Sequence, residues 1–556
     1  MRPSQSSMVL FASGLLACAG RPPTSRPGLF QLAVTESLYA DLRDVRDQVD
    51  ISRALGHNGI TDATPVRFWV MSHNDLRTSV ASRLAAVDST TLRKDDRRAL
   101  EVMRRTLTQD IDSVVAPKPD TVDAGATHQP TCRYDPRALL AWPGGLDSLR
   151  SGLYDCYGWT QSHIVIGTDT LDRLTILGAL GRTAQSARRR LFFLALEPVW
   201  RSVNATNTSS SPYRLLIAEE VKRQRQGLPS LLQASASGVP PDSLEPWLYA
   251  MLDAWRRSNP DSLIEPWDWY YRMGEANRVL SPRISQSRML ELNASVYRAL
   301  GVNVEALGVQ YDLMPRPGKT PVAYTTFGRR PRFINGAWRA GQPWVFATYR
   351  TGGLDNLSEL LHETGHAIHI AAIRTRPAFA DWPDSDPFTE AVADFVALEV
   401  TEPAWEQRWL GDSVPLAVGL RARYSSIVLD MAWALFELKM QRDPTLDPNQ
   451  VWTGLTRDYL GIRPHPELSW WAMRGQLVDA PGYMMNYAAG AMLIAAIRAR
   501  TREIHGPFST GDASWYGWIA PRLFRFGLER PSREVIEEFL GGPVTPKAIL
   551  ADMARR

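Results

Sequence analysis

"LSELLHETGHAIHI" (357–370) is the stretch that most constrains the fold and the chemistry. Its apolar residues recur at three- and four-residue spacing, which predicts a helix. Successive helical residues turn by about 100°, so His362 and His366 lie on one face, where both imidazoles can reach the same metal ion. Glu363 borders that face and can reach a water beside the metal. The alternative is a core helix whose histidines are satisfied by ordinary hydrogen bonds.

A second segment, "DSDPFTEAVADFVALEV" (384–400), supplies the remaining candidates for a metal site. Asp386 is the expected N-cap of a helix, with Pro387 at its first position. Glu390 would complete a His, His, Glu ligand set and leave a fourth position open, as hydrolytic zinc requires. Asp394, one turn later, is placed to accept a hydrogen bond from a ligand imidazole. Taken alone, Glu390 is more simply explained as an acidic residue in the first turn of a helix.

Four segments carry a resemblance to known proteins: "IEPWDWYY" (264–271), "HETGHAIH" (362–369), "FTEAVADFVAL" (388–398) and "YLGI" (459–462). They resemble the thimet oligopeptidase and angiotensin-converting enzyme families, which are gluzincin metallopeptidases that include peptidyl-dipeptidases. The 23 residues between His366 and Glu390 match the spacing of the converting enzymes. The resemblance extends over about 260–500 and implies one Zn²⁺ per chain, held by His362, His366 and Glu390, with Glu363 as the catalytic base.

The tyrosine pair in "APGYMMNYAAGAML" (480–493) gains a role from the same resemblance. Both families use a tyrosine in a comparable place to stabilise the oxyanion, a hydrogen bond that is absent in the ground state. The resemblance therefore implies that Tyr487 is catalytic, with Tyr483 as its helper or alternate. The alternative is that two tyrosines four residues apart simply pack along a helix.

One segment departs from the family pattern. The converting enzymes carry a Lys-x-His triplet before the tyrosines, and the nearest match is Arg474, Gly475 and Gln476. Arginine can bind a substrate carboxylate with two hydrogen bonds. Glutamine can donate a hydrogen bond but carries no charge. Arg474 and Gln476 are therefore candidate substrate-binding residues, and dipeptide release does not follow from the resemblance.

The expected fold class is mainly α, a two-lobed helical metallopeptidase with a small β-sheet beside the HExxH helix and a central channel. Residues 31–304 are expected to be a helical N-terminal part and residues 305–556 the catalytic part, together one peptidase unit. "PVAYTTF" (321–327) and "PWVFATYR" (343–350) are short, aromatic and β-branched, so they predict strands. The resemblance implies that the second is an edge strand that pairs with an extended substrate. An ordinary strand is the alternative.

The N-terminus has the layout of an export signal. Residues 1–18 contain an early arginine, an apolar stretch and then "LLAC", which resembles a bacterial lipobox with Cys18 as the lipidated residue. Residues 19–30 are rich in Pro, Ser and Gly and suit a linker. The longest later apolar run, 488–497, is about half the length that a bilayer requires. The sequence thus predicts an exported, periplasmic or cell-envelope lipoprotein of a bacterium, the alternative being a weakly apolar start to a soluble chain.

Composition limits the classes of partner. Hydrophobic residues make up 44% and charged residues 22%, and the net charge of +4 is spread over 556 residues. These values describe an ordinary globular protein and give no electrostatic case for binding nucleic acid. Cys132 and Cys156 either form a disulfide or remain unpaired, and neither has the spacing of a zinc ligand.

Together these features predict a zinc metallopeptidase acting on short peptides, because the resembling families enclose the site in a narrow channel. We expect no nucleic-acid partner and no obligate protein partner. Contact with a membrane is expected only through the lipid anchor. Two alternatives stay open. The first is a peptidyl-dipeptidase or carboxypeptidase specificity in place of an endo-acting oligopeptidase. The second is a peptide-binding lipoprotein without catalysis, although a pure binder has no need of Glu363.

Overall fold

The computed structural model describes residues 27–56, 64–109, 132, 135–142, 144–228, 241–260, 263–315, 319 and 322–555. The predicted signal sequence 1–18, with Cys18, and the first part of the predicted linker lie outside these residues. Helix α1 begins at Pro27, so residues 27–30 of that linker are helical.

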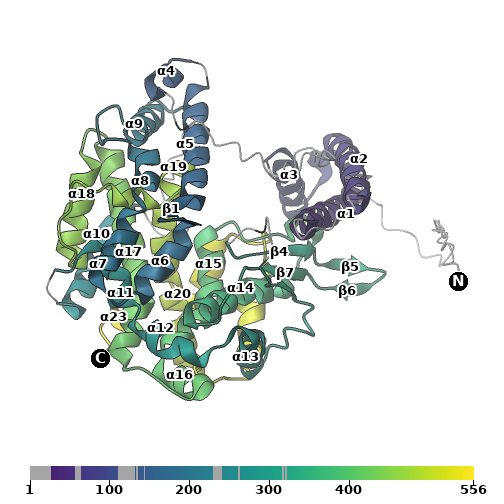
Figure 1. Cartoon of the computed structure of the whole chain (residues 1–556). Helices are drawn as coiled ribbons and strands as arrows, with labels where there is room; N and C mark the ends of the chain where they lie inside the picture. The colour runs from purple at the N-terminus through teal and green to yellow at the C-terminus, as the bar shows by residue number, and fades with distance from the viewer. Residues whose placement is uncertain are drawn as a thin grey trace, which may run out of the picture.

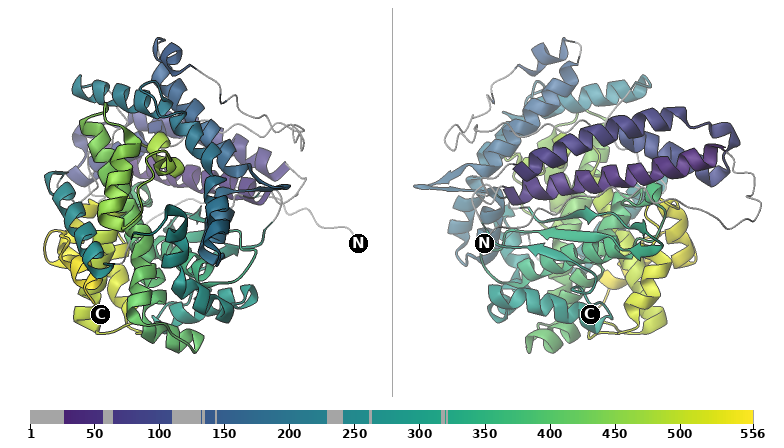
Figure 2. Two further views of the ribbon diagram at one scale, coloured as in Figure 1. Left: turned by 60° about the vertical axis from the view of Figure 1, so that its left-hand side comes forward. Right: turned by 90° about the vertical axis from the view of Figure 1, so that its right-hand side faces the viewer.

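Three N-terminal helices form a unit with its own small core: α1 (Pro27–Gly56), α2 (Thr64–Ala86) and α3 (Lys94–Gln109). In Figure 1 this unit lies to one side of the main body, and the right-hand view of Figure 2 shows α1 and α2 running side by side. Its core, which includes Leu42, Leu84 and Met103, also takes in Phe379 from the main body.

Ion pairs join the N-terminal unit to the main body. Arg330 contacts Asp47 of α1, with 2.9 Å between Nε and Oδ2, and Asp381, with 2.6 Å between Nη1 and Oδ1. Arg376 contacts Glu36 of α1 at 2.6 Å. Several of these charges are buried, so each depends on its partner to offset the cost of leaving water.

The next part of the chain is mostly helical and surrounds a shared core that continues to the C-terminus. Its helices are α4 (Pro136–Leu140), α5 (Gly145–Ser162), α6 (Arg173–Arg182), α7 (Ser186–Leu194), α8 (Glu197–Asn204), α9 (Pro212–Arg225), α10 (Pro241–Ser258), α11 (Trp269–Met273), α12 (Glu275–Leu280) and α13 (Gln286–Ala299). The hairpin β1 (Ile164–Ile166) and β2 (Asp169–Leu171) interrupts them.

A small sheet precedes the HExxH helix, as predicted. It has the strand order β3-β7-β4, formed by β3 (Gln310–Asp312), β4 (Tyr324–Arg329) and β7 (Gln342–Phe346), with β7 parallel to β3 and antiparallel to β4. The hairpin β5 (Arg332–Ile334) and β6 (Ala337–Arg339) extends beyond it (Figure 1). The prediction that "PWVFATYR" is the edge strand is wrong, because β7 has a hydrogen-bonded neighbour on each side. The edge strand from the other predicted segment is β4.

The C-terminal part returns to helices. These are α14 (Leu354–Ala372), α15 (Asp386–Ala397), α16 (Pro403–Leu410), α17 (Leu416–Arg442), α18 (Pro448–Leu455), α19 (Gln476–Asp479), α20 (Met484–His505), α21 (Trp515–Ile519), α22 (Ser532–Leu540) and α23 (Lys547–Met553). Helix α15 packs between α14 and α20, and α20 also packs on α17. The predicted class, a mainly α fold with a small sheet beside the HExxH helix, is confirmed.

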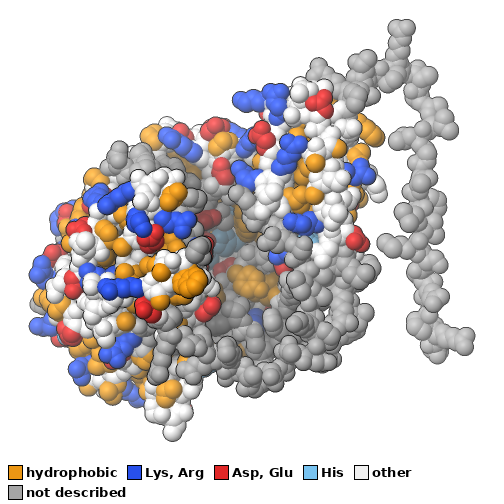
Figure 3. Space-filling view, turned by 90° about the horizontal axis from the view of Figure 1, so that it is seen from above, with side chains coloured by type: hydrophobic (Ala, Val, Ile, Leu, Met, Phe, Trp, Pro, Cys, Tyr) orange, Lys and Arg blue, Asp and Glu red, His pale blue; other side chains and the backbone are white. Residues whose placement is uncertain are grey.

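Other structural features bear on the sequence predictions. Cys132 and Cys156 are joined in a disulfide, which closes the question left open by sequence. Among the helices that the structure describes, none combines the length and apolar composition of a bilayer-spanning segment. Seen from above, the surface is hollowed between the N-terminal helices and the main body (Figure 3).

Candidate metal centre and its surroundings

Helices α14 and α15 cross closely at the candidate site, and a glycine permits this approach. Gly365 lies in the middle of "HETGH", and a Cβ atom at this position would lie 2.6 Å from the carbonyl oxygen of Ala393 on α15. No side chain fits at that distance without moving a helix. The same contact sets Glu390 and Asp394 opposite the two histidines of α14.

The local start of α15 differs from the prediction in one residue. Ser385, not Asp386, is the N-cap, and its hydroxyl accepts a hydrogen bond from the amide of Phe388. Asp386 is the first helical residue, with Pro387 next. An acidic side chain is favourable at this end because of the helix dipole. Glu390 thus lies one turn into a well-defined helix.

His362, His366 and Glu390 converge in space. One ligand atom from each lies within 4.8 Å of the others, and this is the one such cluster found in the described residues. Nε2 of His362 lies 3.4 Å from Oε2 of Glu390, and Nε2 of His366 lies 3.8 Å from its Oε1. The Glu390 side chain is 44% exposed. The three groups therefore face one another and remain open to solvent on one side.

Asp394 orients the first histidine. Its Oδ1 lies 2.7 Å from Nδ1 of His362, which leaves Nε2 directed at Glu390. Burial alone lowers the pKa of His362, but Asp394 and Glu390 raise it well above the ordinary range. Burial and the neighbouring His362 lower the pKa of His366 to about 3, so its imidazole is neutral. Burial raises the pKa of Glu390, but the hydrogen bond with His362 and the two neighbouring imidazoles together lower it below its ordinary value.

Glu363 lies outside the ligand cluster and has a separate partner. The hydroxyl of Thr325, on the edge strand β4, donates to Oε2 of Glu363 at 2.7 Å. The glutamate is buried, and burial raises the pKa of its carboxyl group while His362 and Thr325 lower it. A carboxylate with a raised pKa beside two imidazoles is suited to accept a proton.

The tyrosines approach the same site from α20. The hydroxyl of Tyr483 donates to Oδ2 of Asp386 at 3.4 Å, and Nε2 of Gln476 donates to the hydroxyl of Tyr487 at 3.2 Å. The two rings pack edge to face with centroids 5.5 Å apart. Burial raises the pKa of both phenols, and Glu390 also acts to raise each of them. Both hydroxyls are therefore protonated at neutral pH and can donate hydrogen bonds.

Arg474 is already paired. Its guanidinium forms an ion pair with Asp430 of α17 and lies over the ring of Trp433, 4.8 Å from the centroid. The ring centroid of Tyr487 is 5.9 Å away. Asp430 neutralises the positive charge of the Arg474 guanidinium, which the sequence predicts to bind a substrate carboxylate. Gln476, the other predicted substrate-binding residue, contacts Tyr487.

His369, one turn beyond His366, is part of the core. It is fully buried among Trp382, Phe388 and Phe524, and it is not in the ligand cluster. Neither ring nitrogen has a hydrogen-bond partner within the described part of the chain. Burial lowers the pKa of His369 to about 3, which keeps it neutral.

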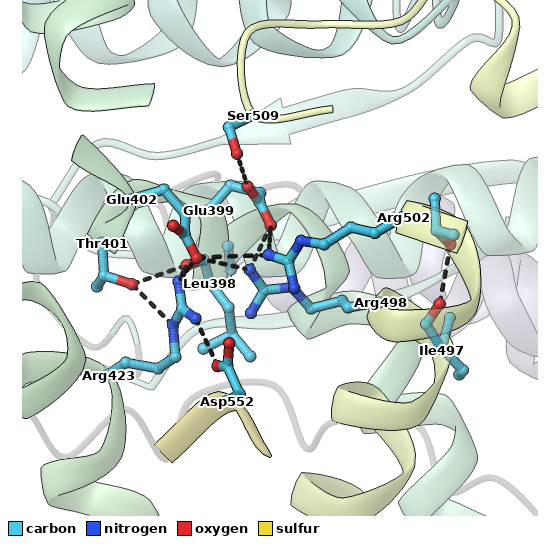
Figure 4. A network of polar contacts seen from close by, with 12 residues as sticks. Leu398, Glu399, Thr401, Glu402, Arg423, Ile497, Arg498, Arg502, Ser509 and Asp552 are labelled. Carbon is cyan, nitrogen blue, oxygen red and sulfur yellow. Dashed lines mark hydrogen bonds and ion pairs between the residues drawn. The ribbon is translucent and has the colours of Figure 1, made fainter. Parts of the chain in front are cut away.

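A buried polar network fixes the far end of α15 (Figure 4). Glu399 and Glu402 follow that helix, and they form ion pairs with Arg498 of α20 and Arg423 of α17. Arg423 also contacts Asp552 of α23 at 2.7 Å. The helix that carries Glu390 is thereby joined to the helix that carries the tyrosines.

Sequence reasoning missed three residues of this site: Thr325, Asp430 and Ser385. Thr325 is in a predicted strand, but only the register of β4 against α14 reveals that it faces Glu363. Asp430 is 44 residues before Arg474 on a helix with no motif. For Ser385 the signal was present, since serine is among the preferred N-caps.

Comparison with known proteins gives a match at the level of structure. No family model and no curated protein sequence matches the chain. Among solved structures, a putative oligoendopeptidase F is 15% identical, with 96% of this chain and 96% of that chain covered and a TM-score of 0.52. PZ peptidase A, solved with an inhibitor, is 12% identical, with coverage of 96% and 97% and a TM-score of 0.55. At these identities the likeness is one of fold, over almost the whole length of each chain.

Proposed function

Because the chain has the fold of these two peptidase structures and brings two histidines and two glutamates together in it, we propose that it is a zinc-dependent peptidase for short peptides. The observation that carries the proposal is the convergence of His362, His366 and Glu390 within 4.8 Å. Glu363 stands apart from them, held by Thr325. A ligand set with a separate carboxylate is what metal-assisted hydrolysis requires.

The donor set fits a zinc ion. Two imidazole nitrogens and one carboxylate are the ligands of many catalytic zinc sites, which keep a further position for water or substrate. His366 is neutral, and Nδ1 of His362 is engaged by Asp394, so His362 would offer Nε2 once the ion displaces the proton from that nitrogen. His362, His366 and Glu390 would therefore hold the ion. When bound there, zinc polarises the scissile carbonyl and lowers the pKa of water.

Glu363 would carry the proton in this reaction. Its carboxylate accepts the proton of the attacking water and returns it to the leaving amine. The Thr325 hydroxyl occupies Oε2 and so orients the carboxylate, which leaves Oε1 for the water. The raised pKa of Glu363 makes it a stronger base than an exposed glutamate.

Tyr487 would stabilise the oxyanion. Its phenol is protonated, and Gln476 donates to its oxygen, which leaves the phenolic proton free to be donated elsewhere. The hydroxyl of Tyr483 makes only a long hydrogen bond, to Asp386 at 3.4 Å, and Tyr483 is the helper of Tyr487 in this scheme. A donor that meets developing charge contributes more in the transition state than in the ground state.

A short extended peptide is the substrate class that these features favour. The edge strand β4 lies beside the HExxH helix and can pair with an extended chain through main-chain hydrogen bonds. Arg474 and Gln476 support the tyrosine, so they give no separate argument for a carboxylate-directed dipeptidase or carboxypeptidase cut. Such a cut is the alternative specificity, and peptide binding without catalysis is the alternative class.

A digest of a defined peptide tests the proposal. We expect a blocked peptide of about ten residues to be cleaved internally, activity to disappear with a zinc chelator, and added zinc to restore it. Products read by mass spectrometry separate internal cleavage from stepwise removal of C-terminal residues. Binding of the peptide with no cleavage at full zinc loading would favour the binding protein.

The cellular location is part of the same proposal. The N-terminal motif supports export with lipidation at Cys18. We expect the full-length protein to partition with membranes in a bacterium that processes lipoproteins, and Cys18→Ala to release it. Membrane partitioning that is unchanged in the variant would remove this part of the proposal.

A further inference from the structure

Helix α17 presents three side chains to the tyrosine-bearing segment. Asp430, Trp433 and Glu437 are three and four residues apart, so they lie on one face of the helix. Asp430 and Trp433 hold Arg474, whose guanidinium lies against the ring of Tyr487. Glu437 acts at a different point, the turn from which α20 starts.

The Glu437 carboxylate binds the backbone of that turn. One oxygen accepts the amide hydrogen of Gly482 at 2.7 Å, and the other accepts that of Met484 at 3.0 Å. Glu437 is only 2% exposed, and within the described residues no lysine or arginine acts on its carboxyl group. Burial raises the pKa of Glu437 to about 8, and the two backbone hydrogen bonds are the interactions that lower it and so favour the ionised carboxylate.

The two amides flank Tyr483 and lie at the open end of α20. The first amides of a helix have no partner within it, and α20 has no side-chain cap from its own N-cap residue. Glu437 supplies these missing acceptors from another helix. Tyr487 follows one turn later, so the position of the turn determines where its hydroxyl lies relative to α15.

We propose that Glu437 is a positioning residue for Tyr487: its carboxylate fixes the start of α20 and thereby the distance from the phenol to the reacting carbonyl. This inference rests on the proposed function, in which Tyr487 stabilises the oxyanion. It extends that function to a residue that touches neither substrate nor metal. A displacement of about 1 Å at such a group costs on the order of 100-fold in rate.

Glu437→Gln tests the inference, since an amide keeps one acceptor and places a donor against the second backbone amide. We expect kcat to fall by roughly 10- to 100-fold with KM changed by less than about threefold. In a Tyr487→Phe background the same substitution should change kcat by less than about twofold, because the phenol that it positions is gone. Glu437→Asp, which keeps the carboxyl group but shortens the side chain, should give an intermediate loss and serves if the amide variant does not fold.

Glu406→Gln is the matched control. Glu406 is also fully buried and accepts a backbone amide hydrogen, from Val414 at 2.8 Å, but it lies on α16 (Figure 1). It should lower thermal stability and leave kcat unchanged. Two outcomes would overturn the inference about Glu437 and leave the proposed function standing. One is an equal loss of kcat from Glu437→Gln in both backgrounds, and the other is a normal kcat for Glu437→Gln in the parent background. A Tyr487→Phe variant with normal kcat overturns the proposed role of Tyr487 and the inference with it.

Discussion

Nδ1 of His362 and Oδ1 of Asp394 lie 2.7 Å apart, across the contact between α14 and α15. A carboxylate on this nitrogen fixes the tautomer and the ring orientation, and it makes Nε2 a better metal ligand. The distance thus connects the packing of two helices to the chemistry of the site. It also explains why a residue that binds no metal should affect metal affinity.

Asp394→Asn should lower zinc affinity by about 10- to 100-fold, because the amide holds His362 without a charge. The affinity is measured by competition with a chromogenic chelator. Asp386→Asn, on the same helix but in contact with Tyr483, is the control and should keep the affinity of the parent. Equal affinities in the parent and Asp394→Asn would contradict the orienting role.

Tyr487→Phe should lower kcat by about 10²- to 10³-fold and leave KM within about threefold, because in the proposed mechanism the lost hydrogen bond forms only in the transition state. Steady-state kinetics on one peptide measure both constants. Tyr249→Phe on α10 is the control, since that ring packs on Tyr459 and should be neutral. A rise in KM at constant kcat would instead assign Tyr487 to substrate binding.

The Asp430–Arg474 pair gives a prediction about specificity. Because Asp430 neutralises Arg474, the pair should not select for a free C-terminal carboxylate. We expect the double variant Asp430→Asn/Arg474→Gln to lower kcat/KM by the same factor for a free-acid peptide and for its C-terminal amide. A loss confined to the free-acid peptide would favour the dipeptidase or carboxypeptidase alternative.

Acid stability should depend on Glu402. Burial raises the pKa of its carboxyl group, but Arg555 and Arg423 lower it to about 2, against 4.5 for an ordinary glutamate. The pKa is lower in the folded state, so this stabilisation is complete above about pH 4.5 and is lost as the pH falls towards about 2. Glu402→Gln should cost on the order of 2 kcal/mol near neutral pH and flatten the pH dependence in that window.

Denaturant unfolding at a series of pH values measures this effect. Glu291→Gln, at an exposed position on α13, is the control and should reproduce the profile of the parent. A Glu402→Gln profile that runs parallel to that of the parent would assign the acid sensitivity to other carboxylates.

The sequence predicted the parts of this molecule that depend on local periodicity. The helices that carry His362 and Glu390, the strands before them and the mainly α class all follow from patterns a few residues long. The convergence of Glu390 with the histidines was predicted from the spacing in a resembling family, because no local pattern fixes how α14 crosses α15. Gly365 is the physical reason for that crossing, and the sequence displays it without revealing its partner.

Contacts between distant segments could not be predicted. The order of strands in the sheet depends on pairings between segments tens of residues apart, and β7, for which the resemblance implies an edge position, is the central strand. Arg474 is a predicted substrate-binding residue because of its place in the triplet, and its actual partner, Asp430, could not be foreseen on a helix without a motif. The pairing of Glu437 with the amides of Gly482 and Met484 likewise joins residues 45 positions apart or more and needs the folded chain.

The central claim is that His362, His366 and Glu390 hold a zinc ion while Glu363 moves the proton. Zinc content and peptide turnover, measured together for the parent and for Glu363→Gln, test it most directly. We predict about one zinc per chain in both proteins and a turnover that falls by about 10²- to 10⁴-fold in the variant. Stoichiometric zinc with equal turnover in the two proteins would contradict the account.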